Sequence, residues 1–132
     1  MWAAYDEKTA HDIYYASNSP VTKRTYTFFR AMLYRSGDKV WSEIYDGKAM
    51  YFATRARDHV RLIGIAVRYE YQGQGMGKVV LFRLLSRMKR NNLYKLTFRT
   101  PIVEDAQSFW LHLGEKIVDV NGDDYEMVLT IK

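Results

Sequence analysis

The chain has no cysteine, which excludes disulfides, thiolate metal ligands and a cysteine nucleophile. Its histidines, at positions 11, 59 and 112, do not have the spacing of metal ligands. No apolar run reaches the length of a membrane-spanning helix, and the first residues lack the charged and then apolar order of a signal peptide. We therefore expect a cytoplasmic protein without a metal site and without a membrane partner.

Acidic residues are absent from one long segment. Residues 78–99 contain seven basic residues and no Asp or Glu, whereas residues 100–132 contain two basic and seven acidic ones. Arg83, Arg87 and Arg90 have helical spacing, so a solvated helix face explains much of this charge. The functional alternative is that the segment attracts the phosphates of a ligand or an acidic macromolecule, either protein or nucleic acid.

The 132 residues, 48% of them apolar, suffice for one hydrophobic core and one domain over residues 1–132. Ser19-Pro20 is typical of a helix start, with serine as the N-cap and proline at the first helical position. Asp46-Gly47 is a strong hairpin signal. The elements predicted before residue 57 are a helix over 7–16, a helix from Pro20 to about Gly37, and strands at Lys39–Tyr45 and Ala49–Ala56.

A glycine-rich loop lies between an apolar strand, residues 62–67, and a helix with apolar positions at Val80, Leu81, Leu84, Leu85 and Met88. Glycines at 73, 75 and 77 let the backbone approach a ligand without interference from Cβ atoms. Successive N–H groups and the dipole of the following helix favour an anion at this place. The loop therefore predicts a site for a phosphorylated ligand.

Two common nucleotide motifs do not fit this loop. A P-loop ends in Gly-Lys followed by Ser or Thr, but here Gly77-Lys78 is followed by Val79. The dinucleotide fingerprint needs the spacing G-x-G-x-x-G, and an acidic residue about twenty positions further on. The glycines here have a different spacing, and the expected acidic residue is missing.

The loop resembles the acyl-CoA pyrophosphate loop of the GNAT superfamily of N-acetyltransferases, whose pattern is Gln/Arg-x-x-Gly-x-Gly/Ala. Gln72, Gly75 and Gly77 match this pattern, and Ala66-Val67 matches the small residue and valine that end the preceding strand. The order of the later segments is also similar over about residues 39–132. These segments are a strand at 93–100, a short helix with Ala106, Phe109 and Trp110, and closing strands at Lys116–Val120 and Tyr125–Ile131.

The resemblance implies an α/β fold with a mixed, mostly antiparallel, twisted sheet flanked by helices. Two central parallel strands, at 59–67 and 93–100, would splay apart and admit the pantetheine arm of acetyl-CoA, the implied co-substrate. The cofactor-binding residues implied in this way are Ile65, Ala66, Val67, Gln72, Gly73, Gln74, Gly75, Met76, Gly77, Lys78 and Phe109.

The implied activity is transfer of an acetyl group to a primary amine by direct attack on the thioester. The sequence departs from the family at two catalytic positions, because Trp110 replaces a frequent tyrosine acid and Arg61 replaces a glutamate base. The substitute catalysts that we consider are His59, Glu43 and Tyr94. His59 can instead be a turn residue beside Asp58, Glu43 can be an ion-paired residue, and Tyr94 can serve packing.

The sequence leaves the acceptor open. Arg55, Arg57 and Arg61 add positive charge near the implied acceptor side, which favours an acidic macromolecule over a polyamine. Two alternatives to a general N-acetyltransferase remain: a relative that modifies a nucleobase or a charged RNA, and a GNAT-fold module that binds without catalysis. Small domains of this family often dimerise, so a homodimer is an expectation as well.

Overall fold

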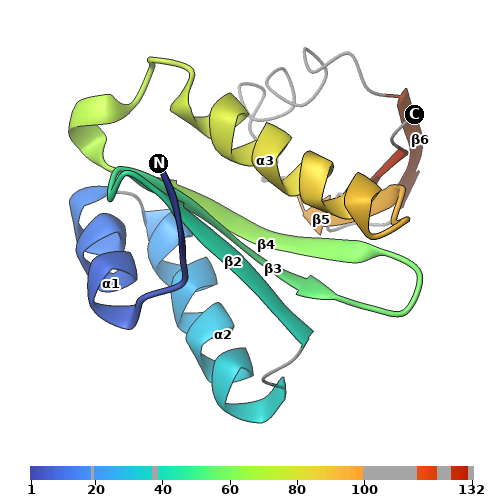
Figure 1. The fold of residues 1–132 in the computed structure, drawn as a ribbon, viewed down its shortest axis with the longest axis horizontal. Helices are drawn as coiled ribbons and strands as arrows, with labels where there is room; N and C mark the ends of the chain where they lie inside the picture. Colours follow the sequence, from blue (N-terminus) through green and yellow to red (C-terminus); the bar gives the residue numbers. More distant parts are fainter. Residues whose placement is uncertain (19, 37–38, 100–115, 122–125, 131–132) are drawn as a thin grey trace.

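The computed structural model describes residues 1–18, 20–36, 39–99, 116–121 and 126–130. Within these ranges seven strands form one sheet in the order β1-β2-β3-β4-β5-β7-β6. Helices α1 and α2 cover one face of the sheet, and α3 covers the other (Figure 1). The elements are β1 (Trp2–Ala4), α1 (Glu7–Ala16), α2 (Pro20–Ser36), β2 (Val40–Tyr45), β3 (Ala49–Arg55), β4 (Val60–Val67), the 3₁₀ helix η2 (Tyr69–Tyr71), α3 (Met76–Arg90), β5 (Lys95–Arg99), β6 (Lys116–Asn121) and β7 (Glu126–Thr130).

The two central strands, β4 and β5, form the parallel pair of an otherwise antiparallel sheet, as predicted. Their ladder runs from Val60 opposite Leu96 to Leu62 opposite Phe98 and then stops. Both strands continue, but the next residues, Ile63 and Arg99, are not paired with each other. From Ile63 onward, the edge of β4 that faces β5 has no strand partner among the described residues, so the predicted splay is present.

A β-bulge lies at the point where β4 leaves β5. Phe52 of β3 pairs with Gly64, and the next residue, Ala53, pairs with Leu62, so Ile63 is the extra residue on β4. A bulge bends its strand and increases the local twist. The bend therefore begins where the two parallel strands separate.

The core consists of two hydrophobic clusters, one on each face of the sheet. All five predicted apolar positions of α3 are buried in the first cluster, together with Tyr51 and Ala53 of β3. The neighbouring β3 residues, Met50 and Phe52, pack in the second cluster against α1 and α2, where Tyr26 and Phe29 are buried. Because side chains of a strand alternate between faces, β3 supplies both clusters and is buried at every position except its last.

Most of the predicted bounds are confirmed within one residue, including both helices of the first half as far as they are described. The hairpin turn has positive φ at Asp46 (51°) and Gly47 (67°), as its sequence predicts. Strand β5 begins two residues later than expected, because the Leu93 N–H still donates to the carbonyl of Met88 at the end of α3. The strand β1 and the helix η2 were not predicted, and the short helix expected around Phe109 lies outside the described residues.

The described helices include none that has both the length and the apolar character needed to cross a membrane.

Candidate active site

The glycine-rich loop forms an open cradle at the N-terminus of α3. Gly73 and Gly75 have φ values of 77° and 79°, a region that other residues rarely adopt. A Cβ atom built on either glycine would meet nothing within 4 Å. The backbone here therefore faces empty space, and the left-handed Gly75 is also the N-cap of α3.

The first turn of α3 offers free N–H groups to this cradle. Among the described residues, the first backbone bond into the helix is from the Val79 N–H to the Gly75 carbonyl (3.2 Å). The N–H groups of Met76, Gly77 and Lys78 precede it, and helix geometry leaves them without intrahelical acceptors. They border a cavity of about 370 Å³, whose lining residues are Val67, Tyr71, Gln72, Gly73, Gly75, Met76, Gly77 and Lys78.

Gln72 fixes the loop to two other parts of the molecule. Its amide nitrogen Nε2 donates to the carbonyl of Val67 at the end of β4 (3.0 Å) and to the carbonyl of Ser17, which caps α1 (2.9 Å). The side chain thus joins the start of the loop to the end of β4 and to the end of α1. The sequence gives no signal for the bond to Ser17, because that residue lies 55 positions away and contributes only its backbone.

The cradle fits a pyrophosphate group. None of its lining residues is acidic, Lys78 adds a positive charge, and the helix dipole favours an anion. Of the other predicted cofactor residues, Gln74 bonds within the loop to the carbonyl of Glu70 (3.1 Å). Ile65 packs toward the first cluster and Ala66 toward the second, so a ligand along this edge of β4 would meet backbone groups. Phe109 lies outside the described residues.

A second cavity, of about 690 Å³, lies at the opposite end of β4, beside the β3–β4 hairpin. It is lined by Met32, Lys39, Thr54, Arg55, Ala56, Arg57, His59 and Arg61. The Ala56 N–H donates to the carbonyl of His59 and closes the hairpin (2.9 Å). This cavity contains one of the predicted catalytic residues, His59, and all three of the arginines noted in the sequence.

His59 is oriented by the carboxylate next to it. The distance from His59 Nδ1 to Asp58 Oδ1 is 2.8 Å. The hydrogen bond with His59 holds the pKa of the Asp58 carboxyl below its usual value. When the neutral imidazole donates from Nδ1 to this carboxylate, its Nε2 atom is left as an acceptor, which is the state required of a general base.

Glu43, the second candidate, holds α3 against the sheet. Its carboxylate accepts hydrogen bonds from Arg83 Nη2 (3.0 Å) and from the Tyr51 hydroxyl (2.6 Å), and Arg87 donates to the same hydroxyl (3.1 Å). Burial alone would raise the pKa of Glu43, but the bonds from Arg83 and Tyr51 outweigh burial and hold that pKa below its usual value. The structure thus shows the ion pair, and a catalytic part for Glu43 stays a prediction.

Tyr94, the third candidate, lies in the segment between α3 and β5 and is 46% exposed. It lines neither of the two cavities at the ends of β4. The structure therefore does not bring the three candidates together: His59 lines the hairpin cavity, Glu43 lies beneath α3, and Tyr94 is on the surface.

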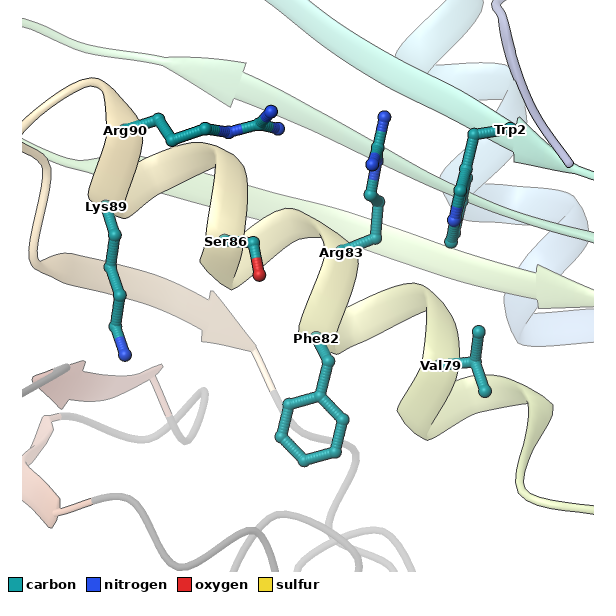
Figure 2. A pocket seen from close by; sticks show the side chains of 7 residues that line it. All are labelled: Trp2, Val79, Phe82, Arg83, Ser86, Lys89 and Arg90. Carbon is teal, nitrogen blue, oxygen red and sulfur yellow. The ribbon is translucent and has the colours of Figure 1, made fainter.

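Two arginines in the basic segment of α3 contact aromatic rings. The guanidinium of Arg83 lies 5.2 Å from the centre of the Trp2 ring, and that of Arg87 lies 4.2 Å from the centre of the Trp41 ring. Figure 2 shows Arg83 directed toward Trp2, whereas Phe82 points away from it on another side of the helix. Arg83 and Arg87 thus help to attach α3 to the sheet.

The sequence matches the Acetyltransferase (GNAT) family over residues 10–114, and the chain belongs to this family. A comparison with curated proteins finds no match.

Solved structures share the fold at low sequence identity. The PaiA N-acetyltransferase from Thermoplasma acidophilum, solved in complex with coenzyme A, has a TM-score of 0.72 and 12% identity, with 100% of this chain and 98% of that chain covered. A GNAT family acetyltransferase from Elizabethkingia anophelis with acetyl-CoA bound has a TM-score of 0.65 and 16% identity, covering 100% and 97%. An acetyltransferase of the GNAT family from Staphylococcus aureus has a TM-score of 0.70 and 12% identity, covering 100% and 99%.

Proposed function

We propose that this protein transfers an acetyl group from acetyl-CoA to a primary amine, as a cytoplasmic enzyme. The observation that supports this most directly is the continuity of the site along β4. The anion cradle stands at the C-terminal end of the strand, the unpaired edge follows from Val67 back to Ile63, and the hairpin cavity with His59 stands at the other end.

The length of β4 suits this arrangement. From Val67 to Arg61 the strand spans six residues, which is about 20 Å. An extended arm that starts from a pyrophosphate in the cradle and follows this edge would bring the thioester past Val67 toward the bulge at Ile63 and the hairpin cavity. Backbone groups of Ile65, Ala66 and Val67 would pair with the amides of the arm.

Acetyl-CoA supplies the activated acyl group, and the residues of the chain have three tasks. The N–H groups of the first turn of α3 and Lys78 hold the phosphates. The edge of β4 orients the arm. His59 Nε2 accepts a proton from the acceptor amine, which must be neutral to attack, while Asp58 holds the imidazole in the required tautomer.

The departing thiol does not require a dedicated acid. A thiol has a pKa of about 8.5, so its thiolate is a tolerable leaving group near neutral pH. Trp110 at the position of the family's frequent tyrosine is therefore compatible with transfer.

Calorimetric titration with acetyl-CoA and with free CoA, followed by a thiol-release assay with a panel of amines, tests the proposal. We expect both ligands to bind and thiol release to depend on an added amine. Failure of both ligands to bind would overturn the assignment of the cradle. Binding without release for any amine, protein or RNA acceptor would instead support the module that binds without catalysis.

A further inference from the structure

We propose that the hairpin cavity binds an acidic group, a carboxylate or a phosphate, that belongs to a small acceptor molecule carrying the reactive amine. This inference rests on the proposed acetyl transfer and names the chemical class of its acceptor. The charge, the shape and the position of the cavity support this inference.

The cavity has an excess of positive charge that the described residues do not neutralise. Four cationic side chains line it: Lys39, Arg55, Arg57 and Arg61. None of them takes part in a salt bridge among the described residues. The nearby carboxylate of Asp58 is bonded to His59 instead. Because like charges oppose entry, a cationic polyamine is a poor ligand here, and an anion is a good one.

Arg61 is the best placed of these cations. Its register partners are Thr54 on β3 and Thr97 on β5, both of which are 9% exposed. Residues paired across strands share a face of the sheet, so Arg61 lies between two small polar side chains and is only half-buried. A guanidinium presented in this way can bind a carboxylate or a phosphate through two parallel hydrogen bonds.

The shape of the cavity favours a small molecule over a nucleic acid. Its volume of about 690 Å³ lies within the usual range of small-molecule sites. The cations come from separate elements, with Lys39 ahead of β2 and the arginines on the β3–β4 hairpin, and they converge on one hollow. A protein that binds a nucleic acid instead has a groove or stripe of positive charge that runs along the backbone of its ligand.

The position of the cavity links acid recognition to the reaction. His59 and Arg61 are two residues apart at the start of β4, and both line the cavity. The unpaired edge of β4 begins two residues after Arg61. An acidic group held by Arg61 and Arg57 would thus place an amine of the same molecule between His59 and that edge.

The test compares matched pairs of amines in the presence of acetyl-CoA, in which only one member of each pair carries an acidic group: O-phosphoethanolamine with ethanolamine, and β-alanine with β-alaninamide. We expect kcat/KM to be at least about tenfold higher for the acidic member, the effect of one charge-assisted hydrogen bond. The double variant Arg57→Gln/Arg61→Gln should lose this preference and keep its affinity for CoA. Arg24→Gln, an exposed arginine of α2 that does not line the cavity, should keep both.

Calorimetric titrations of the CoA-bound protein with O-phosphoethanolamine and with β-alanine give a readout that does not depend on turnover. Binding that is lost in the double variant supports the inference even if acetyl transfer fails. Equal rates for acidic and neutral amines, faster transfer to spermidine, or no binding of either acidic probe would overturn it and leave the proposed activity intact. Transfer only to an acidic peptide or to tRNA would overturn the assignment to a small molecule.

Discussion

The two ends of β4 are built in different ways. At the C-terminal end, one continuous segment makes the cradle from its backbone, with two left-handed glycines and the free N–H groups of α3. At the N-terminal end, the cavity is made by side chains from α2, from the residue before β2 and from the hairpin. A backbone site requires particular residues at fixed spacing, whereas a side-chain site can be changed one residue at a time. We therefore expect single substitutions to change the hairpin cavity more readily than the cradle.

The largest effect is expected from Gly75→Glu, which places a side chain and a negative charge in the cradle. We expect the affinity for acetyl-CoA to fall about 1,000-fold, which is about 4 kcal/mol. Calorimetry measures this change. Gly47→Glu is the matched control, because Gly47 has a similar φ of 67° and open space, but lies in the β2–β3 turn outside the cradle. Equal losses in the two variants would mean that backbone strain, and not the cradle, explains the effect.

A smaller effect on the chemical step is expected from His59→Gln. Loss of a general base should lower kcat by about 100-fold with little change in the affinity for CoA. The limb of the pH–rate profile that rises with pH should also disappear. Asp58→Asn, which changes only the partner of the imidazole, should lower kcat less. An unchanged pH profile in His59→Gln would show that this histidine is only a turn residue.

Glu43→Gln separates the attachment of α3 from catalysis. The loss of the charged bonds to Arg83 should lower the free energy of unfolding by about 2 kcal/mol at neutral pH, with kcat preserved. A carboxyl with a lowered folded-state pKa stabilises the fold above its unfolded-state pKa, and this contribution is lost as pH falls through the folded-state value. Urea unfolding at several pH values should show the two proteins converging under acid conditions. A collapse of kcat in a fully folded Glu43→Gln protein would instead support a catalytic part for Glu43.

The smallest effect is expected from Gln72→Ala, which removes the amide that joins the loop to Ser17 and Val67. We expect an affinity loss of about fivefold, since a net hydrogen bond contributes about 1 kcal/mol. Asn91→Ala is the control, because its amide donates to the carbonyl of Arg87 at the far end of α3. If Asn91→Ala weakens CoA binding as strongly, the bond to α1 has no special part in shaping the cradle.

The shape of the glycine-rich cradle was largely predictable from the sequence, because its geometry depends on local rules. Glycine spacing, a helix with regular apolar positions and the Asp46-Gly47 turn each specify structure over a few residues. The fold followed once the loop was assigned to the GNAT family, since the order of the strands fits one plan.

Other features depended on distant contacts and were missed. Strand β1 has three residues and pairs with β2, a partner about forty positions away, so it carries no pattern of its own. The bulge at Ile63 lies in a run that is apolar on both faces, which hides any break in alternation. The place of Lys39 in the hairpin cavity and the bond between Gln72 and Ser17 also depend on the tertiary fold, and no local sequence pattern predicts them.

The surplus residue in β4 has a consequence for how the cleft can be altered. Strand β4 has eight residues and its partner β3 has seven, and the surplus residue, Ile63, lies where the pairing between β4 and β5 ends. A bulge is a feature of the backbone pairing and does not belong to one side chain. We therefore expect substitutions around the opening to change what enters it, whereas deletion of one residue from β4 should change the opening itself.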